Sequence, residues 1–183
     1  MSQTFECLDL TDRTALAEYE RAFYAAFVRV TGNRLIRALW VWDDAERRLA
    51  TRIAYGDQLI FVVRNAAGNI ETAIATNIAC RDWQAAAFGF SGPTEQEACC
   101  EILTFFTVAD YRLGFKLRFW EACFAELRRR GLKTAYATTA ARLLLAYQRL
   151  GGVLLEQKEI AGEMRYFLEF SLERAWMKRR CGR

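Results

Sequence analysis

The groups best suited to chemistry lie around one apolar stretch in the middle of the chain. Glu101 begins the stretch EILTFFTV, and a carboxylate there could accept a proton from an amine, directly or through water. A solvated strand end is the plainer interpretation. Seven cations follow, opposed only by Glu121 and Glu126: Arg112, Lys116, Arg118, Arg128, Arg129, Arg130 and Lys133. They predict either a solvated helix face or a patch that attracts phosphate or an acidic protein.

Metal and nucleic-acid chemistry find little support in the sequence. The six cysteines form no C-x-x-C pair and the chain has no histidine, so the common zinc sites lose their ligands. We expect no metal site, and thiols that are buried and reduced. No base-reading motif accompanies the positive charge, so nucleic acid is not an expected partner.

The stretch from residue 99 to residue 152 predicts the elements that position these groups. Residues 101–108 are β-branched and aromatic, which is typical of a strand. A helix that ends before Gly131 is predicted by one stripe of apolar residues at spacings of four and three: Leu113, Leu117, Trp120, Phe124 and Leu127. A second strand at 132–139 and a second helix at 140–150 follow, and then paired strands at 152–159 and 164–172. A strand, helix, strand order favours a parallel crossover, with ligands at the strand ends.

The first half of the chain predicts elements that enclose this unit. Thr11 or Asp12 can cap a helix that ends at Gly32, and its buried stripe is Leu16, Phe23, Phe27 and Val30. Asp43 or Asp44 can cap a shorter helix through Ile53, whereas 35–42 is ambiguous between a strand and a pocket wall. Residues 58–65 and 70–79 predict a hairpin around a Gly-Asn turn. Residues 81–97 read as a loop, either over an apolar ligand or at the domain edge.

Size and composition limit the class of protein. A chain of 183 residues fits one domain, which we place at 1–172, followed by a basic tail at 173–183. The apolar fraction is 53% and the aromatic fraction 14%, which indicates either an apolar cavity or a dense core. No stretch resembles a signal peptide or a transmembrane segment, so a cytoplasmic protein is expected.

The order of elements and the segment Tyr147-Gln-Arg-Leu-Gly151 resemble the GCN5-related N-acetyltransferase (GNAT) superfamily. The resemblance implies an α/β (α+β) single domain, with a mixed central sheet of about six to seven strands and helices on both faces. It also implies that Tyr147 protonates the departing thiolate. The alternative for Tyr147 is a ring packed in the core.

The resemblance also implies a donor site. The pantetheine arm of the donor would lie along Phe106, Thr107 and Val108. The phosphate-binding loop would be the run from Arg112 through Gly114 and Lys116. Phe115 and Leu117 stand where the superfamily has small residues, and Ala140 stands where it has asparagine. We therefore expect this loop to bind the pyrophosphate of coenzyme A less well than in conventional members.

These features favour an N-acyltransferase with no tightly bound cofactor. Acyl carrier protein or long-chain acyl-CoA would be the donor, and an amino acid or other small amine would be the acceptor, as in N-acyl amino acid synthases. A conventional acetyl-CoA-dependent N-acetyltransferase and a non-catalytic GNAT-fold binding module are the alternatives. The sequence leaves the oligomeric state open.

Overall fold

A computed structural model describes residues 5–30, 34–92, 98–109 and 111–173. A seven-stranded mixed sheet has the order β1-β4-β5-β6-β7-β9-β8, and a separate two-stranded ribbon pairs β2 with β3. The strands are β1 (Phe5–Cys7), β2 (Val41–Asp43), β3 (Arg48–Ala50), β4 (Gln58–Arg64), β5 (Ile70–Asn77), β6 (Cys99–Thr107), β7 (Thr134–Ala140), β8 (Val153–Ile160) and β9 (Glu163–Ser171). The helices are α1 (Arg13–Phe27), α2 (Arg34–Leu39), a 3-10 turn η1 (Tyr55–Asp57), α3 (Gln84–Ala87), α4 (Leu113–Arg129) and α5 (Ala141–Arg149).

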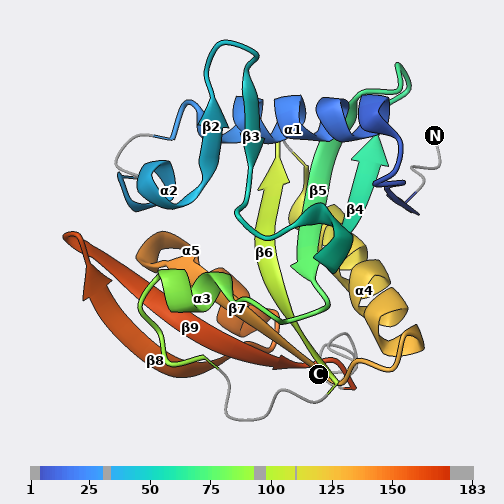
Figure 1. Ribbon diagram of the computed structural model, residues 1–183. Helices are drawn as coiled ribbons and strands as arrows, with labels where there is room; N and C mark the ends of the chain where they lie inside the picture. Colours follow the sequence, from blue (N-terminus) through green and yellow to red (C-terminus); the bar gives the residue numbers. More distant parts are fainter. Residues whose placement is uncertain (1–4, 31–33, 93–97, 110, 174–183) are drawn as a thin grey trace.

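Helices cover both faces of the sheet, as the sequence predicts (Figure 1). The continuous apolar run of β4 shows why. Leu59, Phe61 and Val63 pack in the core under α4, whereas Ile60 and Val62 pack in the core under α1. Successive side chains of a strand point to opposite faces, so a strand covered on both sides must be apolar throughout.

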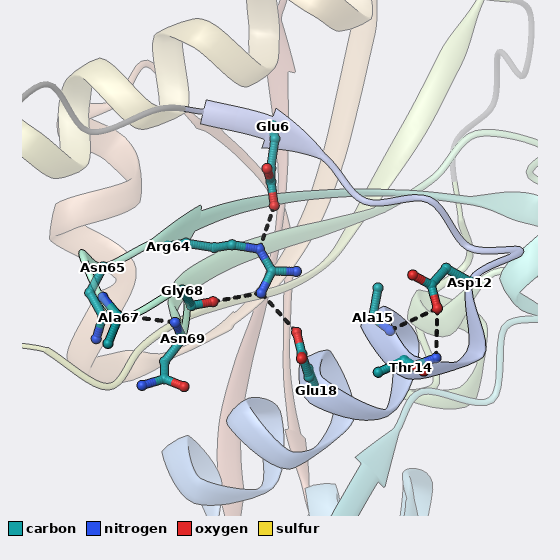
Figure 2. A network of polar contacts seen from close by, with 10 residues as sticks. All are labelled: Glu6, Asp12, Thr14, Ala15, Glu18, Arg64, Asn65, Ala67, Gly68 and Asn69. Atoms are coloured by element: carbon teal, nitrogen blue, oxygen red, sulfur yellow. Dashed lines mark hydrogen bonds and ion pairs between the residues drawn. The ribbon is translucent and has the colours of Figure 1, made fainter.

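Helix α1 is fixed at its start by a cap and by one arginine. Asp12 accepts hydrogen bonds from the amides of Thr14 and Ala15. Figure 2 shows Arg64 between strand β1, helix α1 and the β4–β5 turn, because its guanidinium bonds Glu6 at 2.6 Å, Glu18 at 2.8 Å and the Gly68 carbonyl at 2.7 Å. These contacts hold α1 against the sheet, and the side chain of Phe23 in this helix is fully buried.

Several predicted elements are confirmed with small shifts of their ends. The hairpin at 58–65 and 70–79 is β4 and β5, and the paired strands are β8 and β9. Helix α1 is confirmed but ends at Phe27, before Gly32. Helix α4 buries Trp120, Phe124 and Leu127 as predicted, but its first stripe residue, Leu113, is 60% exposed.

The predicted helix from Asp43 or Asp44 through Ile53 is wrong, because a β-ribbon occupies this segment. Asp43 accepts a hydrogen bond from the Glu46 amide and so closes a turn. Arg47 has a φ of 52°, which a helix does not allow. The ambiguous segment 35–42 divides into α2 and the strand β2, and part of the expected loop 81–97 forms the short helix α3.

Some expectations concern the ends and the cysteines. The predicted tail at 173–183 lies, apart from Glu173, outside the described residues. Among the described cysteines, Cys99, Cys100 and Cys123 are buried and Cys80 is half-buried, but Cys7 is exposed. No helix in the described part of the chain is long and apolar enough to cross a membrane.

Candidate active site

Strands β6 and β7 separate in the middle of the sheet. They pair in parallel only from Cys99 with Thr134 to Ile102 with Ala137. Beyond that rung β6 continues to Thr107 and β7 to Ala140 without further pairing to each other. The backbone groups on these facing edges are therefore available to a ligand that lies between the strands.

A bulge in β6 lies at the point where the strands separate. Thr104 pairs with Ala75 of β5 and Ile102 pairs with Thr76, which leaves Leu103 as an extra residue in the ladder. An inserted residue bends a strand and changes the direction of its backbone groups. The Leu103 carbonyl accepts a hydrogen bond from Gln84 Nε2 at 2.9 Å, so a side chain of α3 fixes this bulge.

A cleft opens at this separation. Its walls come from β6, β7, the first turns of α5, and the aromatic residues of α1 and the segment around α2. The cleft is lined by Phe27, Ile36, Trp40, Gln84, Phe88, Ile102, Leu103, Thr104, Phe105, Thr138, Thr139, Ala140, Arg142, Leu143, Tyr147 and Arg165. Most of these side chains are apolar, and few polar groups converge on the space, which is the usual make-up of a small-molecule site.

Tyr147 lies on this cleft, buried to 8% exposure. Its ring contacts Trp120 at 5.6 Å and Phe170 at 6.0 Å, both edge to face. Burial raises its pKa above the ordinary value of a phenol. The sequence left two interpretations of Tyr147 open, an acid that serves the thiolate or a ring packed in the core. The structure is compatible with both, because the ring packs in the core and the residue also lines the cleft.

Glu101 is fully buried and is not a solvated strand end, so that alternative is wrong. Its carboxylate accepts hydrogen bonds from the Gln84 amide at 2.8 Å and the Ala85 amide at 2.7 Å, at the start of α3. Desolvation raises its pKa to about 7, although these amides and Asn77 oppose the shift. Glu101 is not among the residues that line the cleft.

Gln84 links this carboxylate to the cleft. Its side-chain carbonyl accepts the Trp40 indole N–H at 2.7 Å, while its amide nitrogen holds the Leu103 carbonyl. The result is one buried network through Glu101, α3, the Trp40 ring and the β6 bulge. Sequence analysis missed Gln84, because a single glutamine beside Trp83 carries no spacing signal.

The predicted donor residues lie further along β6 than the cleft. Phe106 is buried and its ring stacks on Phe23 at 5.4 Å, while its carbonyl accepts a hydrogen bond from Thr72. Thr107 Oγ1 donates to the Ala109 carbonyl, and Val108 is 47% exposed. The residues of β6 that line the cleft are 102–105, and Phe106, Thr107 and Val108 are not among them.

The predicted phosphate loop forms the first turn of α4. Arg112 and Gly114 are exposed and Lys116 is half-buried. Phe115 is directed into the core and stacks on Tyr111 at 4.1 Å, so its bulk does not cover the helix terminus. A Cβ at Gly114 would meet only the end of Arg118, at 3.9 Å. The terminus is therefore open to an anion.

The cations of α4 divide into two groups. Arg112, Lys116 and Arg118 are at its start, whereas Arg128, Arg129 and Arg130 are at its end, about 15 to 27 Å away along the axis. Arg129 and Arg130 both bond Glu126, and Arg128 bonds the Leu172 carbonyl. The sequence treats them as one surface, and the structure shows that they are two.

Comparison with known proteins gives the fold. No protein-family model and no curated protein matches the chain. Among solved structures, the CoA-dependent acyl-homoserine lactone synthase BjaI with SAM and isopentyl-CoA matches 94% of this chain and 85% of its own, with 12% identity and a TM-score of 0.75. TofI in complex with an inhibitor and MTA covers 94% and 92%, with 15% identity and a TM-score of 0.70. The ribosomal-protein-S18-alanine N-acetyltransferase from Escherichia coli covers 95% and 96%, with 17% identity and a TM-score of 0.61.

Each of these matches covers at least 94% of this chain, so the likeness extends over the whole mixed sheet and its flanking helices. The chain therefore has the fold of the GCN5-related N-acetyltransferase superfamily.

Proposed function

We propose that this protein is an N-acyltransferase, which moves an acyl group from a pantetheine thioester to the amine of a small molecule by direct attack. The observation that carries the proposal is the separation of β6 from β7 after Ile102 and Ala137, with Tyr147 on the resulting cleft. A thioester arm is a thin chain with amide groups, and the facing strand edges offer the backbone partners that such an arm requires.

The amine nitrogen attacks the thioester carbonyl carbon, and the C–S bond then breaks with its electron pair on sulfur. The nitrogen releases its extra proton to water, so the products are the amide, the thiolate and one proton. Tyr147 is the group assigned to that sulfur. Its raised pKa keeps the phenol protonated at neutral pH, so it donates a hydrogen bond to the developing thiolate. An ordinary thiol has a pKa of about 8.5, below that of a phenol, so complete transfer of the proton is uphill. Stabilisation of the charge on sulfur is the expected contribution.

Glu101 has a different assignment. Both carboxylate oxygens are held by amides of α3, and the residue does not line the cleft. We assign it a positioning role, because it holds the helix that carries Gln84 to the cleft. A role as the base for the amine would need a water relay between the two.

The donor is an acyl-CoA or an acyl carrier protein. The open first turn of α4 supports either one, because phosphate binds well at a helix N-terminus beside Arg112 and Lys116. The apolar walls of the cleft, which include Phe27, Trp40 and Phe88, favour an acyl chain longer than acetyl. An ordinary acetyl-CoA-dependent transferase and a non-catalytic binding module are the competing assignments.

The acceptor is the amine of an amino acid or of another small molecule. SAM, which the BjaI structure contains, is itself an amino acid and belongs in the same screen. The test offers the purified protein acetyl-CoA, a long-chain acyl-CoA or an acyl carrier protein, together with a mixture of amino acids that includes SAM. Release of free thiol and mass spectrometry of the products measure transfer. Transfer that requires a long chain supports the proposal. Transfer from acetyl-CoA alone supports the first competitor, and donor binding without product supports the second.

A further inference from the structure

Two cations from separate elements converge on the cleft. Arg165 comes from β9 and Arg142 from the first turn of α5, and they are the charged side chains among the residues that line it. No acidic side chain is part of that lining. Both charged residues of the lining are therefore positive, and they stand among aromatic residues that include Phe27, Trp40 and Phe88.

Arg165 is an unusual residue to find in such a place. Its side chain is 5% exposed, and burial of a cation is costly unless a partner offsets it. Glu163 is the ion-pair partner, with Nη2 and Oε2 2.6 Å apart, and the Phe88 ring lies 5.6 Å from the guanidinium carbon. Glu163 itself is 21% exposed and lies toward the surface. The pair shows that the guanidinium accommodates a carboxylate at this position.

Strand pairing places the two cations close together. Ala140, which also lines the cleft, is directly opposite Arg165. Directly opposite residues of an antiparallel pair share a face of the sheet. Arg142 follows Ala140 by two residues, at the start of α5. The two guanidinium groups therefore come from neighbouring places at the end of β7.

We propose that Arg165, with Arg142, binds the carboxylate of the acceptor, so that the acceptor is an amino acid and not a simple amine. A guanidinium offers parallel donors that match the two oxygens of a carboxylate. Arg142 is exposed, with no ion-pair partner among the described residues, and supplies charge at the entrance. This inference rests on the proposed acyl transfer and narrows its acceptor.

The first test compares acceptors on the unaltered protein. A mixture of free amino acids, their carboxamides, and the corresponding decarboxylated amines are each supplied with the donor that supports transfer. We expect kcat/KM for the acids to exceed that for the amides and amines by about 10- to 100-fold, the range for hydrogen bonds to a charged group. Equal rates for acids and amides would overturn the carboxylate site while leaving acyl transfer intact.

The second test changes the site. Arg165→Gln and Arg142→Gln are expected to raise KM for the acids about tenfold or more, with less effect on kcat and none on the amides. Arg165→Lys, which keeps the charge, should restore part of the loss. Arg149→Gln is the matched control, because Arg149 is an exposed residue of the last turn of α5 outside the cleft lining. An unchanged preference for acids in both glutamine variants would contradict the proposal.

A third test measures binding of the amino acid mixture by thermal shift without any donor. It distinguishes failure of the carboxylate site from failure of the proposed acyl transfer. If acids bind and Arg165→Gln abolishes the shift, the carboxylate site stands even where no transfer is detected. If no acid binds and none is acylated, the site is refuted together with its acceptor. Should Arg165→Gln fail to fold, Arg142→Gln and the acid-to-amide ratio of the unaltered protein decide the question.

Discussion

Ile102 of β6 pairs with Ala137 of β7 in the last rung of a short parallel ladder, and beyond it the two strands separate. The Leu103 bulge follows at once, and Gln84 holds its carbonyl. This arrangement leaves strand edges unpaired inside the domain, which is costly unless a ligand or water satisfies them. The cleft is therefore a feature that the fold maintains, with Tyr147 on one wall.

Filling the separation should block the donor. Thr138 lies on β7 just past the last rung, lines the cleft and is half-buried. Thr138→Phe places a ring where the arm would lie, so we expect donor affinity to fall at least about tenfold with little change in melting temperature. Calorimetry with the acyl donor measures this. Thr134→Phe, on the paired part of the same strand, is the control, and equal losses in both variants would count against the assigned path.

Loss of the phenol should slow turnover. Tyr147→Phe keeps the ring contacts with Trp120 and Phe170 but removes the donor to sulfur. We expect kcat to fall about 10- to 100-fold with donor affinity almost unchanged, because one hydrogen bond to a charged atom is lost. Tyr166→Phe, a tyrosine of β9 outside the cleft lining, is the control. Full activity in Tyr147→Phe would remove this residue from the mechanism.

The stability of the protein should depend on Glu101 and on pH. Its pKa is about 7 in the folded chain against an ordinary 4.5, so the native state binds the proton more tightly. The stabilisation is complete below about pH 4.5 and is lost as pH rises through 7, with an upper limit of about 3 kcal/mol. The melting temperature of the unaltered protein, relative to Glu101→Gln, should therefore fall between pH 5 and pH 8. The exposed Glu159→Gln should show no such trend, and a flat difference for Glu101→Gln would contradict the buried titration.

The two ends of α4 should differ in donor recognition. Arg112→Glu with Arg118→Glu reverses the charge at the helix start, and we expect binding of acyl carrier protein to weaken at least about tenfold at low salt and less at high salt. Arg129→Glu with Arg130→Glu makes the same change of charge at the far end, about 16 to 27 Å away, and serves as the control. Surface plasmon resonance at two salt concentrations distinguishes them. An equal effect of both pairs would indicate only a general dependence on net charge.

Gly152 should be irreplaceable for a steric reason. A Cβ there would lie 2.9 Å from the Phe170 ring and 3.0 Å from Leu168, and Phe170 in turn packs on Tyr147. Gly152→Ala should cost about 1–3 kcal/mol through overpacking. At Gly56 a Cβ would meet nothing within 4 Å, so Gly56→Ala should be neutral. Chemical denaturation of both variants measures the difference, and equal stabilities would show that β8 shifts freely at this point.

The sequence by itself determined most of the second half of the fold. Alternation of apolar residues and the change to a helical spacing at 113 are local properties, so they predicted β6, α4, β7, α5 and the β8–β9 pair. The resemblance carried by Tyr147 and Gly151 pointed to the right fold. The segment 43–53 was misread because Asp43 caps a turn as readily as a helix, and only the packing of Leu49 against α1 selects the ribbon.

Tertiary structure alone decided the make-up of the cleft. Gln84, Arg142 and Arg165 come from distant segments with no shared spacing, so no local pattern can bring them together. The burial of Glu101 and the division of the α4 cations into two groups depend on what packs against each residue. A strand end and a charged helix face look the same in sequence whether solvent or another element covers them, and that difference sets the pKa of Glu101.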